Sequence, residues 1–143
     1  MNKYIKPLLV IFIALFLNII WEFLHYHLYN DLSGIPANLH LIEASFFDML
    51  IIFLILLIIS LKNRGIKWLN KPSFSDYLII VILGLVIAGG IETLALGIGR
   101  WEYKEIMPTI FGLGVSPLIQ IFVTGILALL IARFFLSISK QKF

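Results

Sequence analysis

The sequence predicts an all-α integral membrane protein that folds as a bundle of four transmembrane helices. The first observation is composition: 61% of the 143 residues are hydrophobic and 13% are charged, and the mean hydropathy is +1.04. The second is the presence of four long apolar segments, at about residues 7–28, 41–61, 77–98 and 109–136. At ~1.5 Å per residue, each can cross a hydrocarbon core of ~30 Å. The third is a segregation of charge between the two ends of these segments. We therefore expect a single membrane domain spanning residues 1–143.

The first segment, 7–28, is expected to remain as a helix. It follows two lysines, as a signal peptide would, but no small-residue cleavage pattern follows and the apolar run continues into Trp21 and Glu22. Residues four apart stack on one helical face, and small or polar residues at this spacing mark where helices approach each other in lipid. In this segment the row consists of Ala14, Asn18 and Glu22, with His25 one turn further.

The other three segments show comparable rows of small and polar residues. In segment 41–61 the row is Ala44 and Asp48, with His40 and Glu43 on an adjacent strip. Segment 77–98 is expected to follow a turn at Pro72 and Ser73, with Asp76 at the helix start. Its row consists of Gly84, Ala88 and Glu92. In segment 109–136 the row consists of Ser116, Gln120, Thr124, Ala128 and Ala132.

The distribution of charge predicts the orientation of the chain. Basic residues precede the first segment, fill the connection between the second and third, and close the chain: Lys3, Lys6, Lys62, Arg64, Lys67, Lys71, Arg133, Lys140 and Lys142. By the positive-inside rule these ends are cytoplasmic, so we expect a multi-pass protein of the plasma membrane with both termini inside. The pI near 9.3 reflects these anchoring charges, and no nucleic-acid partner is expected.

The acidic residues predict a polar pocket near the opposite, outer side. Glu22, Asp48, Glu92 and Gln120 all fall roughly 8–16 Å below the outer ends of their helices, and Glu43 lies near them. Hydrogen bonding between helices accounts for polar residues such as Asn18. It accounts poorly for the acids, because a carboxylate facing hydrocarbon costs ~2.5–3.5 kcal/mol. We expect the acids to line a pocket instead.

Clustered carboxyl groups in such a pocket suit acid–base catalysis on an apolar substrate. One carboxyl group would protonate a carbon–carbon double bond of a membrane lipid or isoprenoid, a neighbouring carboxylate would remove a proton, and no cofactor would be needed. The expected catalytic residues are Glu22, Glu43, Asp48 and Glu92. The expected substrate-binding residues are Asn18, Trp21, Arg100, Trp101, Tyr103 and Gln120, and Phe46 and Phe47 could add aromatic faces. Arg100, after Gly97-Ile98-Gly99, could fold over the pocket and either pair with Glu92 or hold a substrate anion.

Several short motifs carry a resemblance to a known family. The first half contains Trp21-Glu22 and, about twenty residues later, Leu41-Ile42-Glu43-Ala44; the second contains Ile91-Glu92, Gly99-Arg100-Trp101-Glu102-Tyr103 and Pro117-Leu118-Ile119-Gln120. This pattern resembles the membrane-embedded lycopene cyclase type of carotenoid enzyme. The resemblance implies that Glu22 and Glu92 take the place of the family's first acid and that Glu43 matches a motif glutamate. Leu41 replaces a motif proline, and Ile119-Gln120 replace paired acids, which favours a related function on another small lipid.

The sequence is also consistent with two other functions. The pairs Glu22-x-x-His25 and His40-x-x-Glu43 have the spacing of bundle-held divalent metal sites, so a metal-dependent protein is an alternative. A lipid-binding or transport protein without chemistry is another. The inner halves of the segments are almost entirely apolar, so a channel through one chain is disfavoured, whereas a homo-oligomer is not.

The two halves of the chain show a faint internal similarity. Ile35-Pro36 and Met107-Pro108 precede the second segment of each half, and Asp48 and Gln120 occupy matching places after those prolines. This pattern would follow from duplication of a two-helix hairpin.

Overall fold

The computed structural model describes residues 4–30 and 36–141, the last three of these by their backbone alone. Four long helices dominate it: α1 (Ile5–His25), α2 (Ala37–Lys62), α3 (Phe74–Gly97) and α4 (Val115–Gln141). They are accompanied by two short 3-10 helices, η1 (Tyr26–Leu28) and η2 (Ile66–Asn70), and by a small hairpin of β1 (Thr109–Ile110) and β2 (Leu113–Gly114). Each long helix is long and apolar enough to cross a membrane. The prediction of an all-α fold with four such helices is confirmed.

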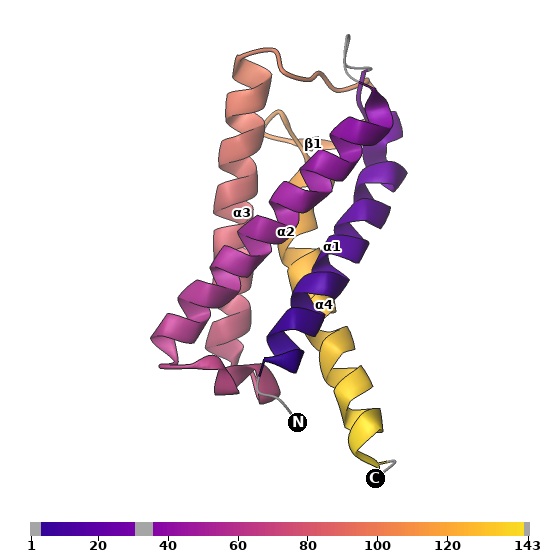
Figure 1. The fold of residues 1–143 in the computed structure, drawn as a ribbon. Helices are drawn as coiled ribbons and strands as arrows, with labels where there is room; N and C mark the ends of the chain where they lie inside the picture. Colours follow the sequence, from indigo (N-terminus) through magenta and orange to yellow (C-terminus); the bar gives the residue numbers. More distant parts are fainter. Residues whose placement is uncertain (1–3, 31–35, 142–143) are drawn as a thin grey trace.

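The helices run alternately up and down, so the described chain has two chemically different ends (Figure 1). The start of α1, the connection between α2 and α3, and the end of α4 lie at one end, which we call the basic end; it carries Lys62, Arg64, Lys67 and Lys71. Segment 98–114 and η1 lie at the other, which we call the acidic end. Three residues named in the sequence analysis lie outside the described residues: Lys3, Ile35 and Lys142.

The core confirms the predicted small and polar rows on three helices. Ala14, Asn18, Glu22 and His25 are the buried residues of α1 together with Val10, and the rows of α3 and α4 are buried except for half-buried Ser116. Gly84 shows why small residues are needed: a Cβ added there would lie 2.9 Å from the Cβ of Phe122. Small residues in these rows let α3 and α4 pack closely.

On α2 the buried face differs from the predicted row. Its buried residues include Leu41, Ser45 and Met49, which lie one position beyond the polar strip, whereas Ala44 and Asp48 are half-buried. The physical reason is the placement of the helix: α2 packs along α1 but contacts α3 and α4 far less. Its polar strip therefore faces a space between helices rather than a helix surface.

The acidic end contains a hairpin where the sequence suggested a continuous helix from residue 109. Thr109 pairs with Gly114, and Ile110 with Leu113. The two turn residues, Phe111 and Gly112, both have positive φ, at 52° and 79°, as a tight two-residue hairpin turn requires. The fourth helix begins only at Val115. At the basic end, Ser73 and Asp76 form a reciprocal cap on α3, which confirms the predicted helix start.

Candidate functional site

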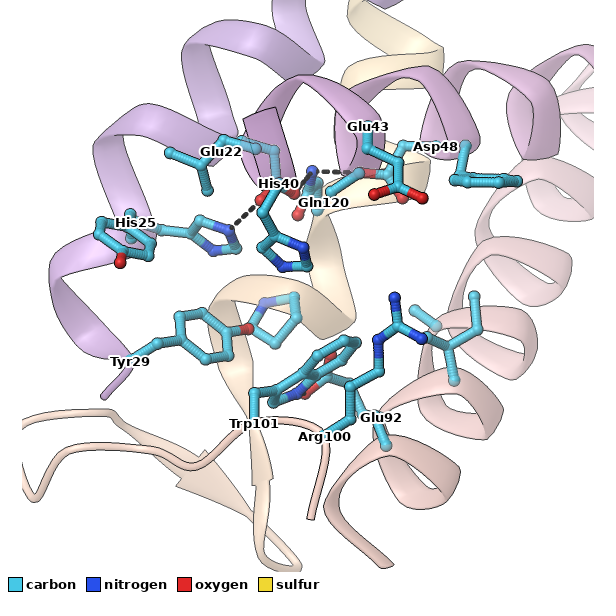
Figure 2. Close-up of a pocket in the computed structure, with 18 of the residues that line it drawn as sticks. Glu22, His25, Tyr29, His40, Glu43, Asp48, Glu92, Arg100, Trp101 and Gln120 are labelled. Atoms are coloured by element: carbon cyan, nitrogen blue, oxygen red, sulfur yellow. Dashed lines mark hydrogen bonds and ion pairs between the residues drawn. The ribbon is translucent and has the colours of Figure 1, made fainter. Parts of the chain in front are cut away.

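A cavity of about 560 Å³ lies at the acidic end of the bundle. It is lined by residues of α1, α2, α3 and α4 and of the segments that follow α1 and α3 (Figure 2). Its polar lining residues include Glu22, His25, Tyr29, His40, Glu43, Asp48, Glu92, Arg100, Trp101 and Gln120. Most of its exposed wall is apolar, with Ile51, Ile91 and Ile121 among the residues that form it. All four predicted catalytic acids therefore reach one cavity.

Gln120 brings two of these acids together. Its Nε2 donates to Glu22 Oε1 at 2.7 Å and to Asp48 Oδ2 at 2.6 Å, and it lies 3.1 Å from Asn18 Oδ1. A primary amide has two hydrogens, so three acceptors crowd around two donors. The side chains of α1, α2 and α4 meet at this nitrogen, which confirms that Glu22, Asp48 and Gln120 lie in one layer.

His25 extends this network towards the start of α4. Its Nε2 lies 3.2 Å from Glu22 Oε2, and its Nδ1 lies 2.8 Å from Ser116 Oγ. Trp21 Nε1 donates to the same hydroxyl at 3.2 Å. Trp21 and Asn18, which were predicted to bind substrate, do not line the cavity. Asn18 contacts the lining residue Gln120, and Trp21 donates to Ser116, which in turn contacts the lining residue His25.

Glu92 is held by the segment that follows α3. The Tyr103 hydroxyl donates to Glu92 Oε2, and Trp101 Nε1 donates to the same oxygen at 3.4 Å. The backbone N–H of Gly114 donates to the Tyr103 hydroxyl at 3.0 Å. Burial, together with the hydrogen bond to Glu92, raises the pKa of Tyr103 above its ordinary value, so its phenol stays protonated and can donate. Tyr103 thus positions Glu92 from behind, while Trp101 itself lines the cavity.

Backbone pairing between two distant segments closes the acidic end over the cavity. Asn30 N–H donates to Glu102 O at 3.0 Å, and Lys104 N–H donates to Leu28 O at 2.9 Å. The Tyr29 ring packs edge-on against Trp101 and Tyr103, with centroids 6.3 and 5.5 Å apart. This arrangement supplies an ordered cover built from residues 28–30 and 101–104.

Sequence reasoning did not single out Tyr29. Burial raises the pKa of its phenol as well, so it presents a neutral ring to the cavity. The one signal in the sequence is the aromatic-rich end of the first apolar segment, with Tyr26 and Tyr29 one turn apart. Nothing local links that segment to Trp101, because the contact depends on how the two hairpins dock.

Two charged residues lie at the mouth of the cavity. Glu43 and Arg100 are both exposed lining residues, and Figure 2 shows the Arg100 guanidinium reaching into the cavity space. The Arg100 side chain forms no hydrogen bond or ion pair with any described residue, so the predicted pair with Glu92 is not formed. His40 also lines the cavity, and its Nδ1 is buried without a hydrogen-bond partner among the described residues.

The predicted metal ligands are only partly brought together. Glu22 and His25 contact each other, as their spacing suggested. Within residues 4–30 and 36–141, however, no three His, Asp or Glu side chains are grouped so that they could hold a metal ion. The pair His40 and Glu43 lines the cavity without joining such a group.

Comparisons of the chain with protein-family models, with curated proteins and with solved structures found no match.

Proposed function

We propose that this chain is a small membrane enzyme that transfers protons on an isoprenoid or a similar lipid by carboxylate acid–base chemistry. The observation that carries the proposal is the cavity of about 560 Å³ in which Glu22 of α1, Asp48 of α2 and Glu92 of α3 meet among mainly apolar walls. Acids in lipid-facing segments are costly. Three acids around a cavity large enough for a small lipid therefore favour a role in catalysis over a role in helix packing.

Glu22, Asp48 and Glu92 each have a role in the proposed reaction. Glu22 and Asp48 face one amide nitrogen of Gln120, and two carboxyl groups at one site relieve their repulsion by holding a proton between them. Asp48 would give this proton to one carbon of a double bond, forming a C–H bond and a cation on the adjacent carbon. Glu92 would take a proton from a neighbouring carbon, whose C–H electrons form the new double bond. The sum is an isomerisation, or a cyclisation where a second double bond attacks the cation.

Aromatic residues and the bundle surface fit this chemistry. The rings of Tyr29 and Trp101 lie against the cavity and can shield a positive centre. Phe47 of α2 and Leu94 of α3 line the cavity and are also exposed on the surface of the bundle. Because α2 and α3 touch sparsely, we infer that a lipid enters between them.

The proposed location is the plasma membrane, with the cavity towards the outer leaflet and both termini in the cytoplasm. The support is the separation of charge: Lys62, Arg64, Lys67 and Lys71 lie at the basic end, and the cavity lies at the other. Basic residues accumulate on the cytoplasmic side of membrane proteins.

The proposal is tested by proton transfer from heavy water. Purified protein is incubated in D₂O with a panel of acyclic isoprenoids that includes lycopene-type polyenes, and products are examined by mass spectrometry. Protonation of a double bond by an exchangeable carboxyl group places deuterium on carbon. We expect Asp48→Asn to lower the rate of incorporation at least ~100-fold. Glu105→Gln is the matched control, because this exposed acid does not line the cavity.

Absence of deuterated product across the panel, or equal rates for Asp48→Asn and the unaltered protein, would refute acid–base catalysis. Lipid retained without turnover would then favour a binding protein. If the protein instead depends on a metal, the purified protein should contain iron, manganese or zinc. Full activity of metal-free protein would eliminate this alternative.

A further inference from the structure

Acidic side chains outnumber basic ones around the cavity. Its mouth carries Glu43 and Arg100, one acid and one base, whose formal charges cancel. Its interior is lined by Glu22, Asp48 and Glu92, and no lysine or arginine lines it among the described residues apart from Arg100. A site with low-dielectric walls and one sign of charge concentrates ligands of the opposite sign. The interior therefore favours a positive ligand.

An unused hydrogen-bonding atom adds a second requirement. His40 Nδ1 is buried without a partner among the described residues, and Figure 2 shows the His40 ring directed into the cavity. A buried polar atom left unpaired costs ~1–3 kcal/mol. This nitrogen has almost no exposed surface, so a ligand in the cavity would reach the other ring nitrogen, Nε2, which also has no hydrogen-bond partner among the described residues. A ligand that carries an N–H group could donate to Nε2.

The walls define the rest of the ligand. The rings of Tyr29 and Trp101 meet edge-on at 6.3 Å, and both residues line the cavity, where ring faces attract cations. Aliphatic residues of α2, α3 and α4 cover most of the remaining wall: Ile51, Ala88, Ile91, Leu94, Ala95 and Ile121. These surfaces suit a hydrocarbon chain rather than a polar body.

We propose that this cavity binds a lipophilic amine in its protonated form, with the ammonium group among Glu22, Asp48 and Glu92 and its hydrocarbon chain against the aliphatic wall. The inference deepens the proposed function and rests on it for its chemical meaning, because an ammonium group reproduces the positive charge of the cation that the reaction would form. Its geometric basis is independent of catalysis. Arg100 alone would favour an anion, but it faces three interior acids.

The test compares three probes that share one isoprenoid chain. Geranylamine is cationic and carries N–H groups, geraniol is neutral, and geranyl phosphate is anionic. Full-length protein in neutral detergent is immobilised, and each probe competes with radiolabelled geranylamine at neutral pH. We expect geranylamine to bind at least ~10-fold more tightly than geraniol, as one desolvated charge contact implies, and geranyl phosphate to bind more weakly still.

Variants locate the ammonium group. Glu92→Gln should weaken geranylamine at least ~10-fold and leave geraniol unchanged, whereas the control Glu105→Gln should alter neither. His40→Phe should reduce the preference for geranylamine over geranyltrimethylammonium, which has no N–H group to donate. The probe series on the unaltered protein needs no variant, so it remains decisive even if a substitution prevents folding.

Equal or tighter binding of geraniol or geranyl phosphate would overturn the inference, and tighter binding of the phosphate would assign the site to Arg100. Failure of the proposed function looks different. Preference for geranylamine without deuterium incorporation would refute the enzyme and leave the amine site standing. Deuterium incorporation without that preference would refute the amine site alone.

Discussion

Gln120 joins three helices through a single nitrogen atom. Its amide contacts Asn18 and Glu22 of α1 and Asp48 of α2, while its own helix is α4. A leucine of similar size would fill the space but would leave both carboxyl groups without this donor. Hydrogen bonds to charged groups contribute more than neutral ones, so the amide should stabilise the bundle as well as orient the acids.

We therefore expect Gln120→Leu to lower the free energy of unfolding by ~2 kcal/mol or more, above the ~0.6 kcal/mol average of one interhelical hydrogen bond. Unfolding of detergent-solubilised protein by sodium dodecyl sulfate measures the change. Thr124→Val is the control: its hydroxyl donates mainly to the Gln120 carbonyl of its own helix, at 2.7 Å, and should cost ~0.6 kcal/mol or less. Equal effects of the two changes would show that the amide does not hold the acids.

The acids of the site could be predicted from the sequence because each is conspicuous in an apolar segment. Acids are unfavourable in lipid, so Glu22, Asp48 and Glu92 stand out as candidates for a site. Their helical spacing and their depth then predict that they lie in one layer. Tyr29 could not be found in this way. An aromatic residue at the end of an apolar segment is ordinary, and its contact with Trp101 depends on docking between segments far apart in the chain.

The helices differ in how well their packing faces can be predicted. In α1, α3 and α4, small or polar residues recur about every four positions, and all of them except half-buried Ser116 are buried. In α2 the apolar residues surround the helix, so periodicity does not distinguish one face from another. Its true packing face could be recognised only from its neighbours. The hairpin at residues 109–114 was missed for a related reason, because its apolar residues read as a continuation of the next helix.

α3 and α4 approach each other closely at Gly84, which leads to a testable prediction. At Gly84 an added Cβ would lie 2.9 Å from Phe122 Cβ and 3.1 Å from Phe122 N, whereas at Gly90 nothing lies within 4 Å. Gly84→Ala should therefore separate the helices and lower the free energy of unfolding by ~1–3 kcal/mol. Gly90→Ala on the same helix should leave it unchanged or raise it by up to ~1 kcal/mol, through helix propensity. The same detergent titration measures both.

A destabilising Gly90→Ala, or a neutral Gly84→Ala, would contradict this packing. The comparison is sharp because both substitutions add one methyl group to the same helix. Gly84 is buried against α4, whereas Gly90 is exposed and has no atom within 4 Å of an added Cβ.

The whole molecule presents an apolar belt between two polar ends. Large apolar side chains are exposed along all four helices, among them Phe12, Phe53, Val86 and Leu130. Such a surface is unfavourable in water and expected against lipid. The basic and acidic ends lie beyond this belt on opposite sides. The molecule therefore has two possible orientations in a membrane, which differ in the end that faces the cytoplasm.

The chain contains no cysteine, which allows a direct test of orientation with single substitutions. Thr109→Cys places a thiol at the exposed hairpin of the acidic end, and Ser75→Cys places one at the exposed start of α3 at the basic end. Neither change alters the charge that directs insertion. In intact cells a membrane-impermeant maleimide should label Thr109→Cys, whereas Ser75→Cys should react only after the membrane is permeabilised. The reverse pattern would place the acidic cavity on the cytoplasmic side, and the proposed lipid substrate would then have to enter from the inner leaflet.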